Sequence, residues 1–127
     1  MKIDTKPLQI GVDSIDVAGT WSQVDKADEL MIASYEISDK QNDMLKALKA
    51  EREFLKNAMD FFKELFKLKP KQIEHIYKQV PGDTLNLYVS YVCGCVKGAT
   101  GSFADFEKDV KKEQESAPKG DPATSND

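Results

Sequence analysis

Residues 44–68 read MLKALKAEREFLKNAMDFFKELFKL, and this stretch decides the fold. Its apolar residues recur at helical spacing and predict about seven turns of helix. At about 100° per residue they fall on two adjacent stripes. The first stripe contains Leu45, Leu48, Leu55, Met59, Phe62 and Phe66. The second contains Ala47, Phe54, Ala58, Phe61 and Leu65. A helix of a small domain usually buries an arc of about 100° or a little more, so two stripes indicate a helix that packs on two sides.

The second stripe provides the candidate partner-binding residues of the chain. An amphipathic helix in a groove is held by anchors at i, i+3, i+4 and i+7, and the positions Phe54, Ala58, Phe61 and Leu65 supply this spacing. We expect Phe54 and Phe61 to be partly exposed in an isolated subunit. The core is expected to take Leu55, Met59, Phe62 and Phe66 from the first stripe. The alternative is that both stripes form one core, and the sequence leaves open which stripe faces a partner.

The whole chain is predicted to be mainly α-helical, in three parts. Residues 1–20 alternate loosely between apolar and polar side chains, which predicts a short N-terminal β-ribbon. Residues 21–110 are expected to form a helical domain, in which a long helix and three shorter helices pack as a small bundle. Residues 111–127 lack apolar anchors and contain prolines, so they are predicted to be a disordered tail.

Capping and breaking residues place the helix ends. Ser22 offers an N-cap for the first helix, and Trp21 is expected to pack against its start. Ser38 either interrupts this helix or lies within one long helix over 22–67. Pro70 fits the first position of a new helix, and Ser102 caps the last one.

Composition narrows the class of protein. The chain has 127 residues, which is the size of one domain, and its net charge is −4. A mildly acidic chain with interleaved lysines argues against nucleic acid as a partner, since phosphate neutralisation needs a concentrated basic face. No run of 18 apolar residues and no secretory signal is present, so we expect neither a membrane span nor export.

Chemistry-bearing residues are few, and none forms a known constellation. Cys93 and Cys95 are two apart in a predicted helix, where they point about 200° away from each other and cannot form a disulfide. They are expected to be small buried or half-buried side chains in a reducing compartment. His75 is the only histidine and is expected at the surface. We therefore expect no catalytic residue, no cofactor, no metal and no enzyme activity.

The run from Phe54-Leu55 through Asp60-Phe61-Phe62-Lys63-Glu64-Leu65-Phe66 to Pro70-Lys71-Gln72-Ile73 resembles the tail assembly chaperones of long-tailed phages that infect Gram-positive bacteria. In that family a long apolar helix meets a turn and then a helix that begins like Lys71-Gln72-Ile73. A further helix ends like 91–98, and an opening strand and a polar tail complete the layout. The resemblance covers about residues 50–98. Lys69-Pro70 stands where other members more often have Thr or Ser, and Cys93-Gly94-Cys95 has no counterpart.

The resemblance implies a non-structural morphogenesis factor in the host cytoplasm. Such a protein binds the tape-measure protein, keeps it soluble and helps to recruit tail-tube subunits around it, and it can form a homo-oligomer. The competing interpretation is a small helical regulatory or immunity-type protein that blocks a protein effector through surface charge. A structural virion component is a third class, which the lack of long strands disfavours.

Overall fold

The computed structural model describes residues 1–40 and 42–116, with side chains described as far as residue 114. Two short strands, β1 (Lys2–Asp4) and β2 (Ser14–Asp16), pair antiparallel with Ile3 opposite Ile15, and a single 3-10 turn, η1 (Lys6–Leu8), lies between them. Five helices follow: α1 (Trp21–Asp39), α2 (Met44–Phe66), α3 (Pro70–Gln79), α4 (Gly82–Val96) and α5 (Phe103–Ser116). The predicted mainly helical fold with a short N-terminal ribbon is confirmed.

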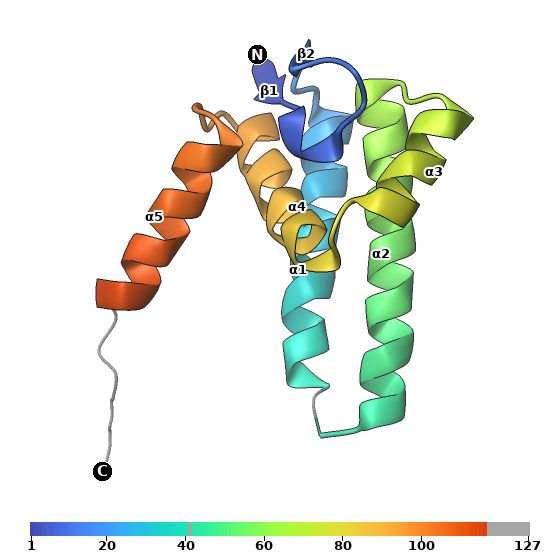
Figure 1. Cartoon of the computed structure of the whole chain (residues 1–127). Helices are drawn as coiled ribbons and strands as arrows, with labels where there is room; N and C mark the ends of the chain where they lie inside the picture. The colour runs from blue at the N-terminus through green and yellow to red at the C-terminus, as the bar shows by residue number, and fades with distance from the viewer. Residues whose placement is uncertain (41, 117–127) are drawn as a thin grey trace.

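The ribbon covers one end of the helices (Figure 1). Ile3 and Leu8 are fully buried beneath it, and the Thr5 hydroxyl, also buried, donates a hydrogen bond to the Val12 carbonyl at 2.8 Å. Two short strands alone are marginally stable in water. The ribbon therefore depends on the helices on which it packs.

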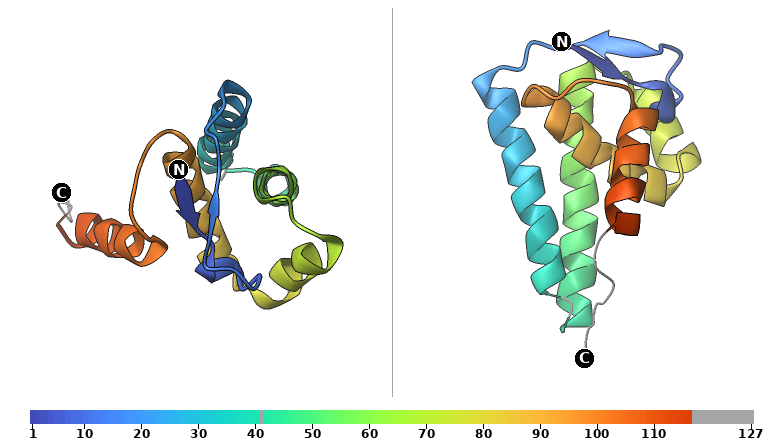
Figure 2. Two further views of the ribbon diagram at one scale, coloured as in Figure 1. Left: turned by 90° about the horizontal axis from the view of Figure 1, so that it is seen from above. Right: turned by 90° about the vertical axis from the view of Figure 1, so that its left-hand side faces the viewer.

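Helices α1 and α2 form an antiparallel hairpin (Figures 1 and 2). The chain breaks after Asp39, and the Asp43 carboxylate starts α2 by accepting a hydrogen bond from the Lys46 N–H at 3.2 Å. The break near Ser38 is confirmed, and one continuous helix over 22–67 is wrong. Asp43 and its neighbours favour a helix start over a helix interior, because their short polar side chains compete for backbone N–H groups.

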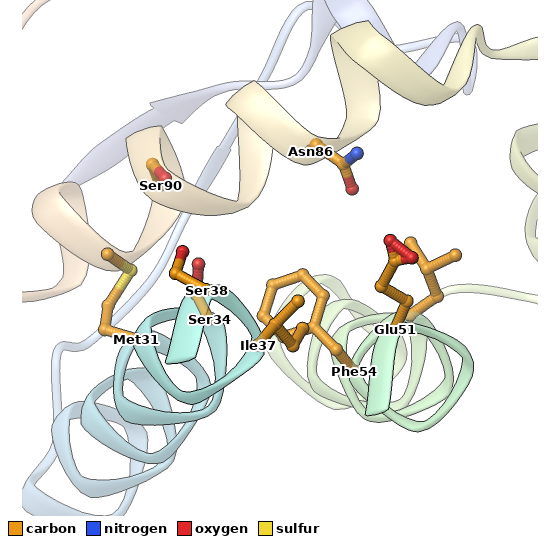
Figure 3. A pocket seen from close by; sticks show the side chains of 9 residues that line it. Met31, Ser34, Ile37, Ser38, Glu51, Phe54, Asn86 and Ser90 are labelled. Carbon is orange, nitrogen blue, oxygen red and sulfur yellow. The ribbon is translucent and has the colours of Figure 1, made fainter. Parts of the chain in front are cut away.

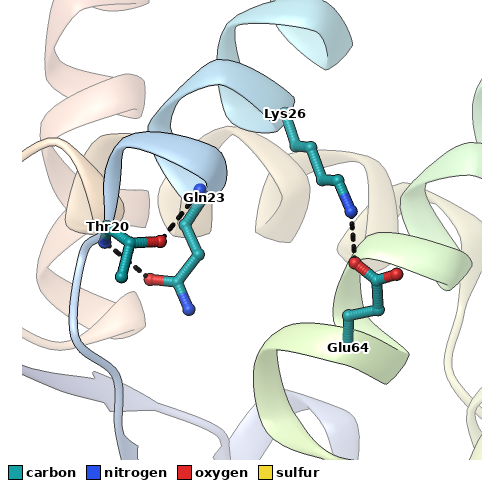
Figure 4. Close-up of polar contacts among 4 residues, drawn as sticks. All are labelled: Thr20, Gln23, Lys26 and Glu64. Carbon is teal, nitrogen blue, oxygen red and sulfur yellow. Dashed lines mark hydrogen bonds and ion pairs between the residues drawn. The ribbon is translucent and has the colours of Figure 1, made fainter.

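The N-cap of the first helix lies two residues before the predicted one. Thr20, not Ser22, is its N-cap, and Gln23 completes a capping box by accepting from the Thr20 N–H at 3.0 Å (Figure 4). Trp21 is 93% exposed, so the expectation that it packs is wrong. The buried residues of α1, Ala27 and Leu30, lie six and nine positions further on, which places them on the opposite side of the helix.

Helices α3 and α4 fold back on the C-terminal half of α2. Phe62 of α2 and Tyr88 of α4 are both fully buried, and their ring centroids are 5.6 Å apart. Aromatic rings continue this contact to Tyr91 and Phe103. The core therefore lies at the ribbon end of the molecule, away from the turn between α1 and α2.

Helix α5 extends away from the body on the side opposite α2 and α3 (Figure 1). The Ser102 hydroxyl caps it as predicted, by accepting from the Asp105 N–H at 3.1 Å. The helix continues to Ser116, so residues 111–116 of the predicted tail are helical. The remainder of that tail, 117–127, lies outside the described residues.

Candidate binding surface

The four residues predicted to bind a partner lie inside the α1–α2 hairpin. The exposed fractions of Phe54, Ala58, Phe61 and Leu65 are 9%, 2%, 4% and 6%. Helix α1 runs along this stripe, and Leu30 of α1 lines the same hollow as Phe61. The expectation that Phe54 and Phe61 are partly exposed in an isolated subunit is therefore wrong. Direct contact of these four residues with a partner stays a prediction.

The other stripe of α2 is covered over only half its length. Phe62 and Phe66 are buried, and Met59 is half-buried. Helices α3 and α4 reach only the C-terminal half of α2, so no helix covers this stripe near the start of α2. The exposed leucines there are Leu45 at 62%, Leu48 at 53% and Leu55 at 40%. The expectation that Leu55 is core is thus also wrong.

An open groove lies where α4 stops covering the hairpin. Its volume is about 380 Å³. Figure 3 shows Phe54 between the two hairpin helices, with Asn86 and Ser90 of α4 facing them across the groove. Its lining consists of Met31, Ser34, Ile37, Ser38, Glu51, Phe54, Leu55, Asn86 and Ser90.

The groove is suited to hold apolar side chains rather than to perform a reaction. Its floor is apolar, and of its nine lining residues only Glu51 is charged. The serines and Asn86 on its walls can hydrogen-bond a passing backbone without adding charge. A nucleophile with an adjacent general base, which covalent catalysis needs, is not present among these residues.

A second hollow lies between α1 and α2 on another side of the hairpin, with a volume of about 360 Å³. Lys26 and Glu64 close one end of it with an ion pair between the two helices (Figure 4). Glu29 and Asp60 also line it. Because both partners of the ion pair are about half exposed, the pair adds little to stability and mainly fixes how the helices lie.

Buried phenols and thiols serve the core. The Tyr88 hydroxyl donates to the Asp4 carbonyl, and the Tyr91 hydroxyl donates to the Gly101 carbonyl at 2.7 Å. Burial raises the pKa of Tyr88 well above its usual range and that of Tyr91 to about 12. Burial likewise raises the pKa of the Cys93 thiol to about 12, and that of Cys95 is raised for the same reason. These cysteines are buried as predicted, and at neutral pH their thiols stay protonated and unreactive.

Among residues 1–40 and 42–116, no group of three or more histidine, cysteine or acidic side chains is placed to hold a metal ion. The single histidine, His75, lies on α3 with a ring nitrogen 3.3 Å from the Gln9 side-chain oxygen. Over the same described part of the chain, no helix has both the length and the apolar character that a bilayer crossing requires.

Sequence reasoning missed the groove because it expected Phe54 to be partly exposed and Leu55 to be core; its assignment of Phe62 and Phe66 to the core is confirmed. The two residues that complete the groove from α4, Asn86 and Ser90, are polar and carry no periodic signal.

A small helical fold with an open apolar groove and exposed leucines is typical of a protein that acts by binding other proteins. The comparison with known families gives a definite assignment. The family model for phage tail assembly chaperone proteins matches residues 1–115, so the chain belongs to this family. No curated protein and no solved structure matches the chain.

Proposed function

We propose that this protein binds the tape-measure protein of its phage in the host cytoplasm, keeps it soluble, and helps to recruit tail-tube subunits around it. It acts by binding and not by catalysis. The family assignment supports a role in tail assembly. The observation that supports the binding site is the groove bordered by α1, α2 and α4, whose floor holds Phe54 and Leu55.

The groove suits a helical client. A helix lying in a groove places anchors from successive turns on one side. The apolar floor offers contacts from two helices at once, at Met31 and Ile37 of α1 and at Phe54 of α2. A client helix that exposes an apolar stripe in isolation aggregates, and covering that stripe keeps it soluble.

Co-expression with the tape-measure protein of the same phage tests the proposal. We expect the client to become soluble and to copurify with this chain. The complex should survive raised salt, because apolar contacts do not weaken with ionic strength whereas exposed charge pairs are screened. Absence of copurification at every salt concentration would exclude the chaperone role.

Leu55→Ser is the variant that tests the groove. Leu55 is 40% exposed, so the fold should be retained while client recovery falls. Tyr77→Ser is the matched control, because Tyr77 is 78% exposed on α3 and lies outside the groove. Equal client recovery with both variants would place the client elsewhere on the molecule.

Two further results bear on the remaining parts of the proposal. Addition of purified tail-tube protein to the chaperone–client complex should give a ternary complex.

The salt dependence of client binding tests the charge-based regulatory interpretation. Client binding that disappears at raised salt would favour it, and the acidic residues of the second hollow, Glu29 and Asp60, would then be the candidate contacts.

A further inference from the structure

The register of the ribbon decides which backbone groups point away from it. In an antiparallel pair, every second pair of opposite residues exchanges hydrogen bonds, and the residues between these pairs direct their N–H and C=O groups outward. Met1 and Val17 form a bonded pair, because the Met1 ammonium donates to the Val17 carbonyl at 3.0 Å and the Val17 N–H donates to the Met1 carbonyl at 2.8 Å. The next bonded pair is therefore Ile3 with Ile15.

Helix α4 closes the outer edge of β1. The outward groups on this strand belong to Lys2 and Asp4. The Asp4 N–H donates to the Tyr91 hydroxyl at 3.2 Å, and the Asp4 carbonyl accepts from the Tyr88 hydroxyl. Because both tyrosines are buried, α4 occupies the place that a further strand would need beside β1.

The outer edge of β2 is open. The outward N–H and C=O groups here belong to Ser14 and Asp16, and we call these groups the β2 edge. Both residues are exposed, and no hydrogen bond from the described part of the chain reaches these groups. In the right-hand view of Figure 2, β2 lies above β1, further from the helices.

The β2 edge specifies the backbone conformation of its occupant. Ser14 and Asp16 are two positions apart in a strand, so their groups repeat at about 6.6 Å. A helix uses its own N–H and C=O groups within itself and has none to offer along its length. An extended segment offers matching groups at the same spacing, as in recognition by strand addition.

The side chains beside the β2 edge are acidic. Asp13 and Asp16 are exposed, and neither forms an ion pair with a described residue. A second copy that added its own β2 would bring these acids together, and like charges on adjacent strands are destabilising. Residues 117–127 of the chain itself contain more acids than bases, and Pro118 and Pro122 have no N–H to donate. These features favour a basic segment of a different protein.

We propose that the β2 edge binds an extended, basic segment of a tail-tube subunit, which adds to the ribbon as a further strand. The inference rests on the function proposed above, in which the helical client occupies the groove and the tail-tube subunit is the second partner. No residue that lines the groove belongs to the ribbon. One molecule can therefore hold both partners at once.

The contact is short and charged, which sets its strength. β2 has three residues, so the added strand buries less surface than a stable protein–protein interface and binds weakly. The acids beside the edge speed association with a basic segment and fix which surfaces meet. Binding should weaken when salt screens these charges, whereas binding of the client in the groove should not.

Amide hydrogen exchange of the full chain, measured by nuclear magnetic resonance, tests the site directly. In the free chain the amides of Ser14 and Asp16 should exchange rapidly. Purified tail-tube protein of the same phage should slow both by at least about tenfold. Binding of tail-tube protein without this protection would overturn the inference and leave the proposed function intact. Absence of any binding would remove both the inference and the recruitment of tube subunits.

The same measurement distinguishes other occupants of the β2 edge. Protection of Ser14 and Asp16 already present in the free chain would show that a second copy or residues 117–127 cover the edge. Protection on adding the tape-measure protein alone would show that the client uses it. Either result would overturn the inference.

Asp16→Pro tests the backbone contact. Proline lacks an N–H but is tolerated on an edge strand where that group points to solvent, and Ile15 before it is already extended. Asp16→Asn is the matched control, because it removes the same charge and keeps the N–H. The dissociation constant for tail-tube protein should be at least about tenfold higher for Asp16→Pro than for Asp16→Asn. Circular dichroism and client recovery should be alike for both, and equal dissociation constants would overturn the inference.

Charge reversal tests the edge without a proline. Asp13→Lys/Asp16→Lys should raise the dissociation constant for tail-tube protein by at least about tenfold at low salt. Asp39→Lys/Asp109→Lys makes the same change in net charge at exposed positions outside the ribbon and should bind like the natural chain. Equal weakening in the two variants would show that tail-tube protein responds to net charge and not to the β2 edge.

Discussion

The carboxylate of Asp4 accepts a hydrogen bond from the backbone N–H of Phe103 at 3.0 Å, and so joins the first strand to the first residue of the last helix. Its other oxygen accepts from the Lys6 N–H, also at 3.0 Å. The Asp4 carbonyl accepts from Tyr88, and the Asp4 N–H donates to the Tyr91 hydroxyl at 3.2 Å. One residue thereby holds η1, α4 and α5 at the ribbon end of the molecule.

Asp4→Ala should destabilise the fold by about 1–2 kcal/mol, because the Phe103 and Lys6 N–H groups both lose their acceptor. The urea midpoint should fall, and limited proteolysis should cut between α4 and α5 sooner. Asp16→Ala, at an exposed position at the end of β2, is the control and should leave both readouts unchanged. Equal midpoints for Asp4→Ala and the natural chain would show that this cap contributes nothing.

Phe61→Ala should cost about 3–5 kcal/mol, as expected for deleting a buried aromatic ring. Phe61 is 4% exposed, and its ring centroid is 6.4 Å from that of Phe62. Leu48→Ser, at a position that is 53% exposed on the same helix, should change stability by less than about 0.5 kcal/mol. Urea denaturation of both variants checks which stripe of α2 is buried. If Leu48→Ser lowered the free energy of unfolding more than Phe61→Ala, the assignment of the stripes would be reversed.

Stability should fall at alkaline pH. The folded chain keeps protons on Cys93 and Tyr91, whose pKa values burial raises to about 12. The unfolded chain releases them near about pH 8.5 and about pH 10. The stabilisation is therefore complete below about pH 8.5 and is lost progressively as the pH rises towards 12.

Urea denaturation across this alkaline range measures the effect. The free energy of unfolding of Cys93→Ala should fall less steeply with pH than that of the natural chain, since one of the titrating groups has been removed. Identical slopes would exclude a contribution from this thiol.

Trp21 provides a simple test of its own environment. It is the only tryptophan and is 93% exposed. At low protein concentration its emission should resemble that of indole in water, and a soluble quencher should reach it equally well before and after unfolding. A large shift of the emission on adding urea would show that the folded chain covers this side chain.

The sequence predicted where the helices and strands lie better than it predicted which of them pack against one another. Pro70 and Ser102 marked helix starts because their preferences act locally, through a missing N–H and a capping hydroxyl. The break after Asp39 was signalled in the same way. Thr20 rather than Ser22 caps α1, and the sequence carries the signal for this, because Gln23 stands three residues after Thr20, where a capping box places Glu or Gln.

The stripes of α2 could not be assigned from periodicity. Both are apolar, and the spacing of Phe61 and Phe62 records only that they point in neighbouring directions. Which of them is covered, and over what length, depends on where α1 and α4 lie. That is set by the hairpin turn and by contacts such as Phe62 with Tyr88, between residues far apart in the chain.

The uneven cover of α2 has a consequence for amide hydrogen exchange. From Met44 to residue 53 only Ala47 is buried, and after Leu30 no residue of α1 is. The turn end of the hairpin can therefore open without disturbing the aromatic core, and its amide protons exchange through such local openings. We expect the amides around Phe62 to exchange only when the whole domain unfolds. On this expectation a single helix spans two cooperative units, with the boundary between them at the groove.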